Sequence, residues 1–150
     1  MSDEANGLKV TISGGEGPFK DPDDVVLKAT YKNIGSKPFS LTFWWTVILI
    51  VRKLDGSIVR PGPGPELPCG VPEEPTILEP GESHTMDRYL QNTQPGGFKE
   101  KIGWGYDLPP GTYDIKLIMN SPPKHGYDVS TRDDTWRGRV KSNIVRITIE

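Results

Sequence analysis

The side chains best suited to chemistry are one cysteine and two histidines, and their spacing assembles no reactive centre. Cys69 stands between a proline and a glycine without a second cysteine, while His84 and His125 fall on separate segments. Nucleophilic catalysis needs a nucleophile beside a base, and zinc needs three or four converging ligands. The sequence contains neither an HExxH motif nor a cysteine–histidine cluster. It therefore predicts a protein that is not an enzyme and holds no metal.

Acidic and glycine-rich turns are the next candidates for a cofactor site. The run KDPDD at residues 20–24 is followed by Val25 and Val26, where a calcium loop would need further ligands and a glycine. The run GGEG at residues 14–17 leads into Pro18 and acidic residues rather than into a helix, so it does not favour phosphate. Both patterns are typical of solvated turns, and no cofactor is expected.

Four tryptophans could offer flat surfaces to a ligand. Trp45 falls in phase with a predicted core, as argued below, whereas Trp44 and Trp104 could reach solvent, and Trp136 lies near the C-terminal strand. An exposed aromatic ring on a β-sheet protein can stack on a sugar ring. A carbohydrate-binding module is therefore the alternative to a protein-binding one.

Basic residues alternate near the C-terminus. Arg137, Arg139 and Lys141 share one face of a predicted strand, close to Arg132. Such a pattern indicates either a solvated strand face or a patch that attracts an anion or an acidic partner.

Among the elements that must position these residues, the most prominent is the apolar run FWWTVILIV at residues 43–51. It is too short to span a membrane, which takes about 17 to 25 apolar residues. Alternation from Phe39 to Val51 predicts one long strand, wet on one face at its start and covered on both faces at its end. Trp44, Ile48 and Ile50 are then either covered by a loop or exposed as a partner-binding surface.

Period-two alternation and turn signals predict about seven strands and no helix. The Asp55-Gly56 pair indicates a tight hairpin after the long strand. The predicted strands cover residues 8–13, 25–31, 39–51, 57–59, 83–90, 113–119 and 145–149.

Two long loops interrupt this pattern, and long loops are often functional. The first, at residues 61–75, contains six prolines, including Pro63 and Pro65, and should be stiff and extended. The second, at residues 120–136, contains His125 and Tyr127. Residues 91–106 give no clear pattern and could hold a short helix or an irregular excursion.

The length, composition and net charge of the chain limit the classes of protein to which it can belong. Its 150 residues suit a single domain, 1–150, and its 17 glycines and 15 prolines are typical of a turn-rich all-β protein. A net charge of −2 argues against nucleic-acid and membrane-surface binding. One cysteine excludes an internal disulfide, and the first residues show no signal peptide. We expect a cytoplasmic protein, or a secreted domain without its leader.

Several short motifs resemble those of bacterial and archaeal immunoglobulin-like domains. They are VLKATYKNIG at 26–35, LEPGES at 78–83, LPPGTYDI at 108–115 and WRGRVKSNIV at 136–145. The chain is most similar to the BsuPI-type intracellular proteinase inhibitor family, with the CARDB-like adhesion module second. It differs from the inhibitor family at Trp44-Trp45-Thr46 and in its two long loops.

This resemblance implies an immunoglobulin-like antiparallel β-sandwich in which Tyr113 forms the tyrosine corner. It also implies a protein partner, in its sharpest form a protease that receives the proline-rich loop in its active-site cleft. We expect a non-catalytic protein-binding module that is a monomer or a weak homodimer. The candidate partner-binding residues are Trp44, Ile48, Ile50, Pro63, Pro65, Trp104, His125 and Tyr127.

Overall fold

The structure, a computed structural model, describes residues 4–14, 17–43, 46–60, 74–90, 106, 108–121 and 134–150. Over these residues the chain is all-β, with one short 3₁₀ turn at Pro22–Asp24, and every pair of named strands is antiparallel. Within the described ranges, no helix has the length and apolar character needed to cross a membrane.

The first sheet joins four strands in the order β1-β2-β3-β8. These strands are β1 (Glu4–Ala5), β2 (Leu8–Ser13), β3 (Val26–Asn33) and β8 (Ser83–Tyr89). Along β2 and β3, every second side chain is buried, as period-two alternation of apolar and polar residues dictates. This arrangement confirms the strands predicted at 8–13, 25–31 and 83–90, apart from small shifts at their ends.

The second sheet runs in the order β10-β9-β5-β6. Its strands are β5 (Val47–Lys53), β6 (Ile58–Val59), β9 (Gly111–Ser121) and β10 (Gly138–Ile149). The predicted hairpin is present, because the amide of Lys53 bonds to the Ser57 carbonyl across the turn. Gly56 has a φ of 91°, a backbone conformation that glycine adopts without strain.

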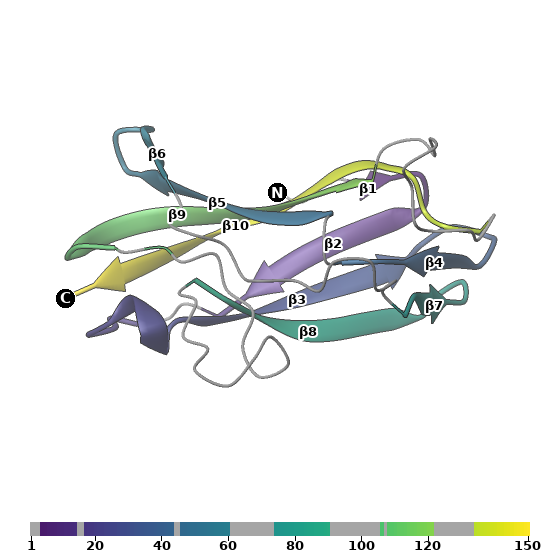
Figure 1. Ribbon diagram of the computed structural model, residues 1–150, viewed down its shortest axis with the longest axis horizontal. Helices are drawn as coiled ribbons and strands as arrows, with labels where there is room; N and C mark the ends of the chain where they lie inside the picture. The colour runs from purple at the N-terminus through teal and green to yellow at the C-terminus, as the bar shows by residue number, and fades with distance from the viewer. Residues whose placement is uncertain are drawn as a thin grey trace.

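A further pair, β4 (Phe39–Leu41) with β7 (Thr76–Leu78), completes the pairing. In Figure 1, β5, β9 and β10 lie above β2, β3 and β8, with β4 and β7 at one end. A single buried cluster takes side chains from both sheets. Its largest fully buried members are Tyr31, Tyr106, Leu8, Leu27, Leu41, Leu49, Leu90, Ile115, Leu117, Met119, Ile147 and Val10.

The long strand predicted over residues 39–51 is wrong in its continuity. The segment forms two strands, β4 and β5, that pair in different sheets. The expected inward phase nevertheless holds at both ends, since Phe39 and Val51 are buried. Ser40, expected to be wet, is also buried, because its backbone bonds to Asp134 and Trp136 and its hydroxyl to Asp134.

The expectation that this segment ends covered on both faces is also wrong. Ile48 remains 42% exposed on β5. The strand count differs as well: the described residues hold ten strands rather than about seven. One additional strand arises because the predicted strand at 39–51 divides into β4 and β5. The other two, β1 and β7, are only two or three residues long, too short to show an alternation in sequence.

A β-bulge shapes the last strand. Lys141 pairs with Ile118 and Ile144 pairs with Lys116, so two residues of β10, Ser142 and Asn143, face Leu117 alone. The Ser142 hydroxyl accepts a hydrogen bond from the Leu117 amide at 2.9 Å. This bond satisfies a buried N–H group that the bulge deprives of a regular strand partner.

The second bulge residue ties the two sheets together. The Asn143 side-chain oxygen accepts from the Ile12 amide at 2.8 Å, and its nitrogen donates to the Ile12 carbonyl at 2.9 Å. The carboxamide therefore offers β2 the donor and acceptor that a neighbouring backbone would offer. Through this contact, hereafter the Asn143 clamp, the edge of the first sheet is joined to β10.

Replacing Asn143 by alanine should lower the free energy of unfolding by about 2 kcal/mol, because two hydrogen bonds of about 1 kcal/mol each are lost. Urea unfolding measures the change. Asn120→Ala is the matched control, since Asn120 is exposed on β9 and should change stability by less than about 0.5 kcal/mol. Equal stability of the two variants would contradict the role of the clamp.

Candidate functional site

The predicted partner-binding residues divide between described and undescribed parts of the chain. Ile48 and Ile50 lie on β5, with side chains on the face turned away from the core. The remaining six candidates lie outside the described residues: Trp44, Pro63, Pro65, Trp104, His125 and Tyr127. Trp45, expected in the core, and Cys69 lie outside them as well. Of the predicted partner-binding residues, the described part of the chain thus contains the two on β5.

The strand register brings further isoleucines beside these two. Ile48 pairs with Ile118 on β9, and Ile50 pairs with Lys116, which in turn pairs with Ile144 on β10. Ile48 is 42% exposed and Ile144 57% exposed, Ile50 is half-buried, and Ile118 is 9% exposed. Directly opposed side chains in a sheet lie about 5 Å apart at Cβ. We call the outer surface made by these four residues the isoleucine face.

Basic side chains lie among the isoleucines and beside them. Lys116 lies between Ile50 and Ile144, and Lys141 of β10 lies opposite Ile118 of β9. Arg139 is the next outward-facing residue of β10 before Lys141. We call Lys116, Arg139 and Lys141 the basic triad. Among the described residues, no carboxylate forms an ion pair with any of the three.

The carboxylate nearest in register already has a cation. Asp114 pairs with Arg146 across β9 and β10, and Nε of Arg146 donates to Oδ1 of Asp114 at 2.7 Å while Nη2 donates to Oδ2 at 3.1 Å. The hydrogen bond from Arg146 holds the pKa of the Asp114 carboxyl below its ordinary value of 3.8. Asp114 therefore stays ionised near neutral pH, with its charge offset by Arg146.

The outer face of the first sheet has a different character. A row of threonines, Thr11, Thr30 and Thr85, crosses β2, β3 and β8, and the Thr30 and Thr85 hydroxyls lie 3.0 Å apart. Beside this row, Lys28 donates to Asp87 at 2.9 Å. Polar side chains with internal partners are what a strand face turned to water is expected to carry. The outer face of the second sheet differs in exposing two isoleucines, Ile48 at 42% and Ile144 at 57%, where the first exposes Val26 at 38%.

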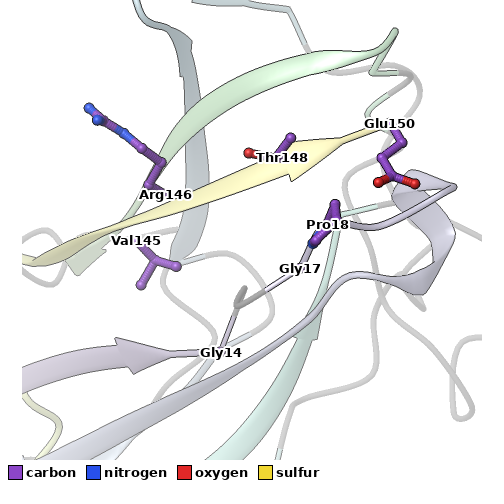
Figure 2. Close-up of a pocket in the computed structure, with 7 residues that line it drawn as sticks. All are labelled: Gly14, Gly17, Pro18, Val145, Arg146, Thr148 and Glu150. Atoms are coloured by element: carbon purple, nitrogen blue, oxygen red, sulfur yellow. The ribbon is translucent and has the colours of Figure 1, made fainter.

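A hollow of about 680 Å³ lies at the other end of β10, between its C-terminal half and the turn after β2 (Figure 2). It is lined by Gly14, Gly17, Pro18, Val145, Arg146, Thr148 and Glu150. Arg146 and Val145 project from opposite faces of β10, and Arg146 is bound to Asp114. Among the described lining residues, the Thr148 hydroxyl lies 3.2 Å from the Thr112 hydroxyl.

Sequence reasoning missed a buried cation. Arg88 on β8 is 5% exposed; its Nη2 donates to the Tyr31 hydroxyl at 3.0 Å, and its guanidinium lies 5.5 Å from the Phe43 ring centre. Burial raises the pKa of Tyr31, against a smaller opposite effect of Arg88, so the phenol stays neutral. The missed signal is the phase of β8, because residues 84, 86 and 88 point inward and carry His, Met and Arg.

The remaining chemical candidates give no reactive centre in the described parts. His84 stacks on Phe43 with ring centres 5.8 Å apart. The described residues contain no group of three or more histidine, cysteine or carboxylate side chains placed to hold a metal. Trp136 is buried and its indole donates to the Ala5 carbonyl, so this tryptophan is no sugar platform.

No protein-family model matches the chain, and no curated protein shows significant similarity to it.

The Asp114–Arg146 pair gives a direct titration test. The pKa of Asp114, measured by carboxyl-carbon NMR, should lie below 3.8 in the wild type and rise toward 3.8 in Arg146→Gln. Since the folded-state pKa lies below the unfolded-state value, the pair stabilises the fold at neutral pH, and this contribution is lost as pH falls below about 4. Arg139→Gln, on the same face of β10, is the control and should leave the pKa of Asp114 in place. A wild-type value at or above 3.8 would show that the pair does not form in solution.

Proposed function

We propose that this chain is a non-catalytic protein-binding module of immunoglobulin-like β-sandwich fold, and that it binds its partner through the isoleucine face. The sandwich form is supported by two four-stranded antiparallel groups that share one buried cluster. The immunoglobulin-like form is supported by Tyr113, whose hydroxyl donates to the Pro109 carbonyl four residues upstream. That bond has the geometry of a tyrosine corner.

The isoleucine face is the single observation that carries the binding role. Free energy favours removal of apolar surface from water by about 25 cal/mol per Å². A sheet face that leaves Ile48 42% and Ile144 57% exposed forgoes part of that gain until another surface covers it. Exposed apolar side chains gathered on one sheet face indicate an interaction site.

Serine at both Ile48 and Ile144 should weaken partner binding roughly tenfold or more, because central apolar contacts dominate the energy of an interface. Both side chains are exposed, so the fold should persist. A partner captured from extract of the cells that make the protein is purified, and its affinity for each variant is measured by calorimetry.

Val26→Ser is the matched control, because Val26 is a β-branched residue 38% exposed on the outer face of the first sheet. It should leave the affinity unchanged. A partner that binds the double variant and the wild type equally would locate the binding surface elsewhere on the chain.

The resemblance to the proteinase inhibitor family supplies a narrower form of this function. In that form the proline-rich loop at residues 61–75 enters a protease cleft, and inhibition of serine, cysteine or metalloproteases should be measurable with the purified protein. A panel without inhibition removes the inhibitor form and leaves the isoleucine face as a general protein-binding surface.

A further inference from the structure

We infer that the occupant of the isoleucine face is an acidic segment of another protein, in which aliphatic side chains alternate with carboxylates. This inference rests on the proposed function, because it names the partner class for the same face.

The local charge of this surface is opposite to the charge of the whole chain. The chain carries a net charge of −2, yet the basic triad has no carboxylate partner among the described residues, and the charge of Asp114 is offset by Arg146. A positive patch on an acidic protein steers negatively charged partners toward it and repels positive ones. The patch coincides with the apolar surface, so both properties select the same partner.

The positions of the charges set the pattern that a partner must match. Lys116 is flanked across the sheet by Ile50 and Ile144, so a partner that covers both isoleucines must also cover the lysine. A covered ammonium group without a counter-charge is unfavourable, whereas a carboxylate opposite it forms a charge-assisted hydrogen bond. The partner therefore needs carboxylates among its aliphatic residues rather than only at its ends.

Two other occupants fit less well. A second copy of this chain, stacked face to face, would bring two basic triads together, and like charges in contact disfavour association. An anionic membrane would supply lipid phosphates to the basic triad, so the geometry of the isoleucines rather than the charge disfavours it. The isoleucines lie on a sheet face rather than on a projecting loop.

A selection of peptides on the protein itself tests the chemistry of the occupant. Random linear peptides displayed on phage are selected on the wild-type protein and depleted on the Ile48→Ser, Ile144→Ser double variant. The surviving peptides should be enriched in aspartate and glutamate next to leucine, isoleucine or valine. Their affinity should fall as salt is raised, because exposed ion pairs are screened.

Reversing the charge of two lysines measures how much the basic triad contributes to peptide affinity. Lys116→Glu with Lys141→Glu should weaken the selected acidic peptides about three- to tenfold or more, in line with the loss of two exposed ion pairs. The matched control is Lys9→Glu with Lys32→Glu, a pair of lysines opposed on the outer face of the first sheet. The control should bind the same peptides as the wild type does.

The outcomes separate the inference from the proposed function. Neutral or basic peptides that require the isoleucines would overturn the acidic partner and leave the binding face intact. A selection that yields no peptide dependent on the isoleucines would overturn both. Equal weakening by the two charge-reversal pairs would show general electrostatics and overturn the inference.

Two direct measurements cover the other occupants. Binding of the wild type, but not of the double serine variant, to phosphatidylserine–phosphatidylcholine vesicles would assign the face to a membrane. A dimer in sedimentation that dissociates on Ile48→Ser with Ile144→Ser would assign it to a second copy. Either result would overturn the inference of an acidic partner. A monomeric protein that does not bind the vesicles would support that inference.

Discussion

The β-bulge at Ser142 and Asn143 is the constraint on which the rest of the structure depends. By placing two residues opposite Leu117, it shifts the phase of β10 by one position. Val145, Ile147 and Ile149 then face the core in the second half of the strand, while Val140 faces it in the first half. The same step lets Asn143 bond to Ile12 of the other sheet. One local irregularity thus both completes the core and joins the two sheets.

The phase shift also determines where the charges lie. Without the bulge, Arg139 and Lys141 would share a face with Val145 and Ile147 and would be directed into the core, where an unpaired charge is strongly unfavourable. With the bulge, they lie on the outer face with Ile144. The position of Arg139 and Lys141 on the same outer face as Ile144 is therefore a consequence of the bulge that closes the core. Bulges often redirect side chains at functional positions, and this one brings apolar and basic groups to one surface.

Sequence reasoning reaches most of the fold because period-two alternation reports burial directly. It identifies the inward residues of β9, Tyr113 to Met119, and the hairpin at Gly56. It fails where the backbone leaves that period. Nothing in residues 39–51 marks the change of sheet between β4 and β5, since neither glycine nor proline interrupts the run.

Only half of the isoleucine face can be predicted from the sequence, for a related reason. Ile48 and Ile50 stand out in an apolar run, but the proximity of Ile118 and Ile144 depends on strand register, which one sequence does not specify. Because the register places Lys116 between Ile50 and Ile144, the face has two properties that oppose each other. Its apolar area favours any hydrophobic occupant, whereas the ammonium group penalises any occupant that removes its water without returning a negative charge. The difference between these two terms, rather than the apolar area alone, sets which surfaces this face can bind.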